Sequence, residues 1–231
     1  MHLRSTDSTN DRARLLAIGG APHGTLVTAA AQTAGRGRHG RRWTAPPDSS
    51  VLMSLVLRSP PALLPLIAAV AVCEVVGEAA RIKWPNDVVI PSASGLSKLA
   101  GILAEGRPQE GWAILGIGLN VAVRLEDLPA ELRRRTATLG ASPDQIEPAL
   151  ERLLRALDRG LEQPEAGTLE AWRARDALNG REIAWGPETP AERRQRGRAE
   201  GIDGTGRLVV ALPDGGHTAL DAGEVRLREI G

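Results

Sequence analysis

The spacing of apolar and polar residues divides the first 178 residues into helical and extended segments. An N-cap signal at Ser8 or Thr9, followed by an acidic first turn, predicts a helix to about Ile18. Further helices are predicted over 63–80, 143–161 and 168–178. Short apolar or alternating runs predict strands over 25–31, 51–57, 81–83, 88–90, 99–105 and 112–121, with a turn over 91–95.

The pattern changes after Asn179 and Gly180. Short β-like segments then alternate with Gly-rich turns, over 182–185, 196–202, 208–212, 217–220 and 224–227. Short strands at such regular spacing predict a small β-barrel, so we place a domain boundary near residue 179. The charge run 193–198 is predicted to be a solvated loop.

Composition narrows the class of protein. An apolar content of 42% and a charged content of 25% are those of an ordinary globular protein. The most apolar stretch, 62–80, is interrupted by Pro65 and carries two glutamates, which favours a buried helix over a membrane span. The net charge of +1 provides no global field for nucleic acid or a membrane surface. The single Cys73 is interpreted as a core thiol, which fits a reducing cytoplasm, and no signal peptide is recognised.

Lysine is almost absent from this chain. Of its 29 basic residues only Lys83 and Lys98 are lysines, and the others are arginines. An ammonium group is a compact point charge, whereas a guanidinium is a wide planar fork. The two lysines are therefore candidates for contact with a single phosphate or carboxylate oxygen.

A basic loop, residues 35–42, lies between the first two predicted strands and is followed by Trp43. Its glycines let backbone N–H groups approach an anion, and its arginines match phosphate and carboxylate. We expect the loop to be mobile until an anion binds. It lacks the ending of a Walker loop, and a solvated loop or a nucleic-acid contact remains an alternative interpretation.

Three further segments could carry chemistry. Lys83-Trp84-Pro85-Asn86-Asp87 places an Asn-Asp pair behind a rigid turn, where Asp87 could hold Mg²⁺ or accept hydrogen bonds. The alternative is an ordinary turn. Lys98 opens an apolar strand, where a lysine usually occupies the solvated end but could instead stabilise charge on a transferring phosphoryl or acyl group. Gly116 and Gly118 flank bulky residues near the end of another strand, which indicates close approach of a backbone or ligand.

Taken together and in this order, these segments resemble the biotin–protein ligases. The matching segments are Asp7-Ser8-Thr9-Asn10, Gln32 with the basic loop and Trp43, Lys83-Trp84-Pro85-Asn86-Asp87, Lys98-Leu99-Ala100-Gly101-Ile102-Leu103 and Gly116-Ile117-Gly118-Leu119-Asn120-Val121. The segment from Gly223 to Arg228 is also similar to that family's closing strand.

The resemblance implies an α+β fold: a mixed β-sheet catalytic domain with flanking helices (1–178) and a small C-terminal β-barrel (179–231). It implies that biotin reacts with ATP and Mg²⁺ to give biotinoyl-5'-adenylate and pyrophosphate. A lysine of a biotin carboxyl carrier protein of a carboxylase would then accept the biotin. The resemblance further implies a cytoplasmic enzyme without a membrane or DNA partner, and it leaves monomer and homodimer both open.

The resemblance also assigns roles to residues. Those implied to be catalytic are Lys98, Arg38 and Asp87. Those implied to bind biotin are Ser8, Thr9, Asn10, Gln32, Arg36, Gly37, Arg38, Lys98 and Gly101. Those implied to bind ATP are Arg36, Arg38, Arg41, Trp43, Lys83, Asn86, Lys98, Asn120 and Arg228, with Asn120 near Mg²⁺ through the phosphates.

Two departures and two rival functions accompany the resemblance. The 91–95 turn is longer than the family's usual link, and the chain starts at the catalytic domain, from which we expect a monofunctional enzyme. A lipoate–protein ligase would share the fold and the adenylate chemistry. A non-catalytic nucleic-acid-binding module would use the basic loop, but the near-zero net charge argues against it.

Overall fold

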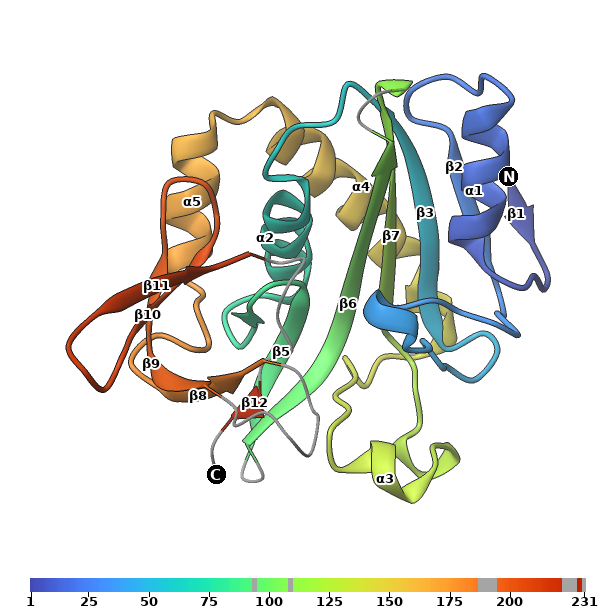
Figure 1. Cartoon of the computed structure of the whole chain (residues 1–231). Coiled ribbons are helices and arrows are strands. Elements are labelled where there is room, and N and C mark those ends of the chain that lie inside the picture. Colours follow the sequence, from blue (N-terminus) through green and yellow to red (C-terminus); the bar gives the residue numbers. More distant parts are fainter. Residues whose placement is uncertain (93–94, 108–109, 187–194, 222–227, 230–231) are drawn as a thin grey trace.

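The computed structural model describes residues 1–92, 95–107, 110–186 and 195–221, and the backbone of 228–229. Its larger sheet has seven strands in the order β1-β2-β3-β7-β6-β5-β4 (Figure 1). The strands are β1 (His2–Leu3), β2 (Leu26–Ala29), β3 (Ser50–Arg58), β4 (Arg81–Lys83), β5 (Asp87–Ser92), β6 (Gly95–Arg107) and β7 (Trp112–Asn120). Strand β1 is parallel to β2, and the other neighbours are antiparallel. This mixed sheet with flanking helices confirms the predicted fold class.

Helices cover both faces of the larger sheet. On one face lies α1 (Thr9–Ile18), while α2 (Leu64–Val76) and α4 (Ile146–Glu162) cover the other, with α5 (Glu165–Arg173) beside α2 (Figure 1). The short elements are α3 (Ala130–Arg133) and the 3-10 helices η1 (Arg38–Gly40), η3 (Leu125–Asp127) and η4 (Pro143–Gln145).

Strand β3 shows why both faces need a cover. Leu55 and Leu57 belong to the larger apolar cluster, which includes residues of α2 and α4, whereas Val56 between them belongs to a second cluster with Ala13 and Ala17 of α1. Successive side chains of a strand point to opposite faces, so an unbroken apolar run requires packing on both sides. The continuous apolar pattern of this strand therefore specifies a central position in the sheet.

A second sheet follows the helices. Its strands are β8 (Glu182–Trp185), β9 (Gln195–Ile202), β10 (Leu208–Ala211), β11 (His217–Leu220) and β12 (Arg228–Glu229), in the order β11-β10-β9-β8-β12. All its neighbours are antiparallel. Among the residues described, the strands pair as an open sheet rather than a closed barrel. The predicted strand 224–227 lies outside the described residues.

The predicted solvated loop over 193–198 was wrong in its described part. Arg196 and Arg198 belong to β9, where they are exposed on either side of the buried Gly197. A one-sided strand of an antiparallel sheet alternates in this way, with charged residues on the solvent face. The overlapping prediction of a strand over 196–202 was the correct one for these residues.

The two sheets share one apolar core. Ile183, Trp185 and Leu208 of the second sheet belong to the same buried cluster as the residues of α2. Trp84 in the turn after β4 is also buried, and its indole N–H donates to the carbonyl of Gly206 at 3.0 Å. The domain boundary near residue 179 stays a prediction, since these contacts cross it.

Three local predictions differ from the structure. Helix α2 ends at Val76 instead of residue 80, because Gly77 takes a φ of 95°. The last predicted helix ends at Arg173, and the chain then runs beside β4, where Ile82 N–H donates to Arg175 O at 2.7 Å. The elements β1 and α3 were not predicted, since two and four residues are too few to show a period.

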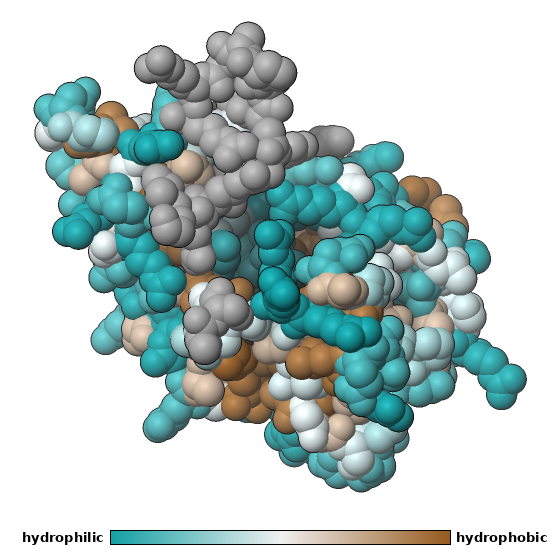
Figure 2. Space-filling model, turned by 90° about the horizontal axis from the view of Figure 1, so that it is seen from below, coloured by the Kyte–Doolittle hydropathy of each residue, from teal (hydrophilic) through white to brown (hydrophobic). Residues whose placement is uncertain are grey.

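The face of the molecule seen from below is mostly polar among the described residues (Figure 2). Figure 2 views the molecule from below and shows mostly hydrophilic residues with apolar patches between them. None of the helices in the described ranges is long and apolar enough to cross a membrane.

The turn between β9 and β10 carries a pH-dependent stabilisation. Burial opposes ionisation of Asp203, but hydrogen bonds from the side chain and backbone of Thr205 and from Arg207 outweigh it and lower the Asp203 pKa to about 2. A depressed carboxyl pKa stabilises the fold above the unfolded value, here 3.8, and this contribution is lost as the pH falls toward 2.

We expect Asp203→Asn to lower the free energy of unfolding at pH 7 by about 1–3 kcal/mol, the usual contribution of hydrogen bonds to a charged group. Between about pH 4 and pH 2 the wild type should lose more stability than the variant. Urea unfolding across this range measures both effects. Asp214→Asn is the matched control, because the Asp214 carboxylate accepts one hydrogen bond, from Gly216 N, at an exposed turn. Parallel pH profiles for Asp203→Asn and the wild type would contradict the prediction.

Candidate active site

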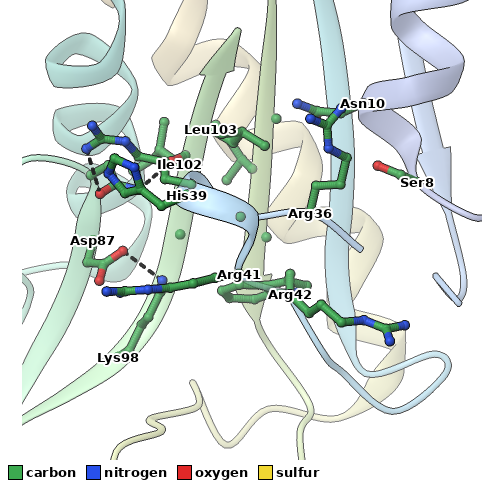
Figure 3. A pocket seen from close by; sticks show the side chains of 18 of the residues that line it. Ser8, Asn10, Arg36, His39, Arg41, Arg42, Asp87, Lys98, Ile102 and Leu103 are labelled. Carbon is green, nitrogen blue, oxygen red and sulfur yellow. Dashed lines mark hydrogen bonds and ion pairs between the residues drawn. The ribbon is translucent and has the colours of Figure 1, made fainter. Parts of the chain in front are cut away.

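A pocket opens on the α1 face of the larger sheet, beyond the region that α1 covers (Figure 3). Segments far apart in the sequence supply its walls: the start of α1, the basic loop with Trp43, the turn between β4 and β5, and strands β6 and β7. It gathers most of the predicted site residues: Ser8, Thr9, Asn10, Gln32, Arg36, Gly37, Arg38, Arg41, Trp43, Lys83, Asn86, Asp87, Lys98 and Gly101.

Glycines on neighbouring strands form the floor of the pocket. Gly101 of β6 pairs with Gly118 of β7, and Gly116 lies two residues before it on the same face. A Cβ atom on Gly116 would lie 2.0 Å from Asn10 Oδ1, and one on Gly118 would lie 2.4 Å from Trp43 Cε2. Such distances are far below van der Waals contact, so these positions require glycine for close approach rather than for backbone dihedrals. This confirms the close approach that the sequence indicates at Gly116 and Gly118.

Trp43 lies on this glycine floor. Its ring contacts the positions that side chains at Gly101 and Gly118 would occupy, and its Nε1 is buried without a hydrogen-bond partner. An unsatisfied buried donor is unfavourable by about 1–3 kcal/mol. The indole N–H is therefore a donor that a polar ligand in this pocket could use.

Lys98 and Asp87 form an ion pair at one side of the pocket (Figure 3). Lys98 Nζ lies 2.7 Å from Asp87 Oδ1 and 5.5 Å from the centroid of the Trp43 ring. The two residues stand on the antiparallel strands β6 and β5, and both side chains are partly exposed. The ammonium group is thus held by a carboxylate and an aromatic face while it remains open to a ligand.

The opposite end of the pocket is a neutral hydrogen-bonding wall. Gln32 Oε1 accepts from Thr9 N at 2.7 Å and from Thr9 Oγ1 at 3.1 Å. Ser54 Oγ lies 2.8 Å from Thr9 Oγ1 and 2.5 Å from Asn10 Oδ1, so its single hydroxyl proton serves this pair of acceptors. Ser8 is the N-cap of α1 and its hydroxyl makes no capping bond. This hydroxyl is available to a ligand because the N-terminal turn of α1 does not use it.

The basic loop folds back on itself. Gly37 N–H donates to Arg41 O at 2.8 Å, and Trp43 N–H donates to Gly35 O at 3.0 Å. Between them the chain makes the turn η1, with Gly40 at a φ of 72°. Burial lowers the pKa of Arg38, and the nearby Asp87 opposes this shift. An arginine remains protonated through such a shift, so its charge persists in the pocket.

Arg36 points away from Lys98 and toward α1 (Figure 3). Its Nη1 lies 2.6 Å from Asp11 Oδ1 and its Nη2 lies 2.8 Å from Glu105 Oε1. The sequence analysis did not identify Glu105, nor Ser54. The signal for Glu105 was present: it is a carboxylate that continues the two-residue spacing of Gly101 along β6, on the pocket face.

Two predicted site residues are not placed in the pocket. Asn120 Nδ2 donates to Ala137 O at 2.9 Å and its Oδ1 accepts from Ser50 at 3.4 Å, and this side chain does not line the pocket. Arg228 lies in β12, and its side chain falls outside what the structure describes. The proposed contacts of both with ATP stay predictions.

The side chains present do not form a dedicated metal cage. Within the described ranges, no group of three or more His, Cys, Asp or Glu residues could hold a metal ion. Asp87 is paired with Lys98, and the amide of Asn120 is used inside the protein. A magnesium ion that keeps most of its ligands from water and phosphate would not need such a cage.

The fold and the pocket define a class: an α+β protein with a cationic small-molecule site built on a glycine floor. A model of the Biotin/lipoate A/B protein ligase family matches residues 2–121, and one of the Biotin protein ligase C terminal domain matches residues 193–228. The chain belongs to the Biotin/lipoate A/B protein ligase family.

Curated relatives and solved structures agree with this membership. The bifunctional ligase/repressor BirA of Bacillus subtilis is 42% identical over 155 residues, which are 62% of this chain and 46% of BirA. The chain thus spans about half the length of that relative. The biotin–[acetyl-CoA-carboxylase] ligase of Mycobacterium tuberculosis is 34% identical over 95% of this chain and 85% of its own length. Biotin protein ligase from Aquifex aeolicus, solved in complex with biotin and ATP, aligns with a TM-score of 0.80 at 25% identity over 100% of this chain and 98% of that chain.

Proposed function

We propose that this protein is an ATP-dependent biotin–protein ligase. In the first step a carboxylate oxygen of biotin attacks the α-phosphorus of ATP, and pyrophosphate leaves to give biotinoyl-5'-adenylate. In the second step a lysine amine of a biotin carboxyl carrier protein attacks the acyl carbon, AMP leaves, and the amine loses a proton. The Mycobacterium tuberculosis relative, matched over nearly the whole chain, supports this assignment.

The observation that carries the proposal is the position of Lys98. Its ammonium group lies at the edge of the glycine floor, 2.7 Å from Asp87, in a chain with almost no other lysine. The first step brings two anions together, so its transition state requires a fixed cation. We assign Lys98 to the carboxylate and the α-phosphate, and Arg38 and Arg41 to the remaining phosphate charge.

The neutral wall and Asp87 supply the remaining roles. Ser8, Thr9 and Gln32 present hydroxyl and amide groups without charge, which suits a ureido group better than a phosphate. Asp87 accepts a hydrogen bond from Lys98 and would orient the incoming carrier amine once the adenylate has drawn Lys98 toward itself. Magnesium would arrive on the ATP phosphates, since the described side chains offer no cage for it.

The carrier protein and the location of the enzyme complete the proposal. The carrier protein is inferred from the name of the Mycobacterium tuberculosis relative and from the open side of the pocket at Lys98. A cytoplasmic location fits the free, buried Cys73, because burial raises its pKa to about 12 and keeps it an unreactive thiol.

The rival substrate is lipoate, whose ligases share the family model. The polar wall favours biotin, because lipoate has no ureido group to use the hydrogen bonds of Ser8, Thr9 and Gln32. Unpaired polar groups in a site strongly disfavour an analogue that lacks the matching partner.

ATP–pyrophosphate exchange tests the proposal. We expect labelled pyrophosphate to be incorporated into ATP when biotin is present. Without biotin the rate of incorporation should fall to background. Lipoate at the same concentration should support less than about a hundredth of that rate, given the usual penalty for unpaired polar groups. Exchange that is absent with biotin, or faster with lipoate, would refute the assignment. Nucleic-acid binding that weakens steeply with salt, in a protein without exchange activity, would favour the non-catalytic module.

A further inference from the structure

We propose that Glu105 is a positioning residue that, together with Asp11, clamps Arg36 and divides the basic loop into a fixed and a free part. This inference rests on the proposed function for its kinetic consequences and on the contacts alone for its structural ones. Glu105 stands on β6, Asp11 on α1, and Arg36 bridges them from the loop.

The contacts of Glu105 connect three elements. Its Oε1 lies 2.8 Å from Arg36 Nη2, and its Oε2 lies 2.9 Å from Arg14 Nη2 and 3.1 Å from Asn10 Nδ2. Three-quarters of the Glu105 side chain is shielded from solvent, with 24% exposed. A carboxylate with three donors at this depth joins β6, α1 and the loop more firmly than a surface ion pair would.

Charge balance within the cluster removes Arg36 from ligand binding. Two carboxylates, Asp11 and Glu105, face two guanidiniums, Arg14 and Arg36, so the cluster is neutral as a whole. Withdrawing Arg36 toward a phosphate would leave two carboxylates with Arg14 alone, and so one uncompensated negative charge in a partly buried site. We therefore assign the side chain of Arg36 to the protein and leave its backbone N–H to the ligand.

The fixed part of the loop has close packing on both sides. A Cβ atom on Gly35 would lie 2.5 Å from Trp43 O and 2.9 Å from Gln32 Nε2. The first residue of the loop is therefore packed against the backbone of Trp43, which follows the loop. After Gly37 the loop is more exposed, as at His39 and Gly40, until Arg42 donates to Thr33 O and bridges back to Arg36. The clamp thus holds residues 35–37 against the sheet, while 38–41 can rearrange around a ligand.

Asn10 extends the effect of Glu105 to the pocket wall. Its Oδ1 would lie 2.0 Å from a Cβ atom on Gly116, and its Nδ2 is held by Glu105. Loss of the clamp is therefore expected to loosen the entrance of the loop and the adjacent wall together. Substrate binding should suffer more than the chemical step, which depends on Lys98 on the other side of the pocket.

Trypsin cleavage of the ligand-free protein tests the clamp without reference to activity. Trypsin cuts after arginine, and mass spectrometry resolves the Arg36–Gly37 bond from the Arg38–His39 and Arg41–Arg42 bonds. In the wild type we expect cleavage at the two later bonds and resistance at the first. Glu105→Gln should make the Arg36–Gly37 bond about tenfold faster to cleave, because a segment opens more often once its anchoring contacts are lost. Equal resistance of this bond in both proteins would overturn the clamp.

Steady-state adenylation kinetics give the second readout. Glu105→Gln should raise the KM for biotin about tenfold and change kcat by less than about threefold, the pattern of lost positioning rather than lost chemistry. Glu105→Asp keeps the charge, so its KM for biotin should lie between those of the wild type and Glu105→Gln. The matched control is Glu74→Gln, which removes a carboxylate that pairs with Arg159 at 2.8 Å on the far face. A fall in kcat with KM unchanged would overturn the positioning role.

A double-mutant cycle separates the clamp from general destabilisation. The effects of Glu105→Gln and Arg36→Met on the KM for biotin should be strongly non-additive. The KM of the double variant should lie within about twofold of that of the more impaired single variant. If Glu105→Gln does not fold, Asp11→Asn breaks the outer contact alone and should shift cleavage and KM in the same direction by less. Additive effects would refute the coupling. If the wild type shows no biotin-dependent exchange, the proposed function fails, whereas the cleavage pattern still decides the clamp.

Discussion

Lys98→Arg is expected to reduce biotin-dependent ATP–pyrophosphate exchange by at least about 100-fold, as removal of one aimed donor does elsewhere. The substitution keeps the positive charge but changes its shape. Lys98 Nζ fits between Asp87 and the Trp43 ring, and a Cβ atom on the neighbouring Gly101 would already lie 3.0 Å from it. A guanidinium is wider and cannot bring a single charge to the same point.

Thermal unfolding provides the control for Lys98→Arg. The side chain is partly exposed and its ion pair contributes about 0–1 kcal/mol, so the melting temperature should change little. Lys98→Met, which removes the charge and keeps the stem, should lose as much activity as Lys98→Arg. Pyrophosphate release at the wild-type rate in either variant would remove Lys98 from the proposed chemistry.

Arg38→Gly is expected to release the activated acyl-adenylate about tenfold faster or more, because it removes a charge-assisted contact and loosens the chain. Arg38 belongs to the free part of the basic loop and lines the pocket, with Asn86 Oδ1 3.5 Å from its Nη1. The clamp on Arg36 should still hold the entrance of the loop, so adenylate formation should persist. Labelling of bulk protein amines in the absence of a carrier protein measures the leak.

Arg38→Lys is the companion variant, because it keeps a positive charge at this position and introduces no glycine. It should leak less than Arg38→Gly and more than the wild type. The same retention of adenylate in all three proteins would mean that the free part of the loop does not cover the intermediate.

Local chemistry was readable from the sequence wherever neighbours along the chain decide it. Lys98 was identified by its rarity, Gly116 and Gly118 by their spacing within an apolar strand, and α1 by its N-cap signal. These features depend on residue type and on the period of a helix or strand, both of which are local properties.

The sequence was less informative where a residue's partner is distant. Arg36 was predicted to contact biotin and ATP, and this stays a prediction. Its partners within the protein, Asp11 and Glu105, lie 25 and 69 residues away, and no local pattern indicates them. Asn120 was predicted to lie near the phosphates, which stays a prediction, and the sequence did not indicate that its amide joins the end of β7 to Ala137. The barrel was inferred from strand count alone, and the described strands pair as an open sheet.

By itself the sequence determined most of the elements, the class of chemistry and the lysine that we assign to it. Only the tertiary structure decided which charges remain for a ligand. Whether a guanidinium is available depends on which carboxylates the fold brings within 3 Å of it, and no local pattern records that. The basic loop contains four arginines in the sequence, whereas in the structure Arg36 is paired with two carboxylates and Arg42 donates to Thr33 O. Arg38 and Arg41 line the pocket.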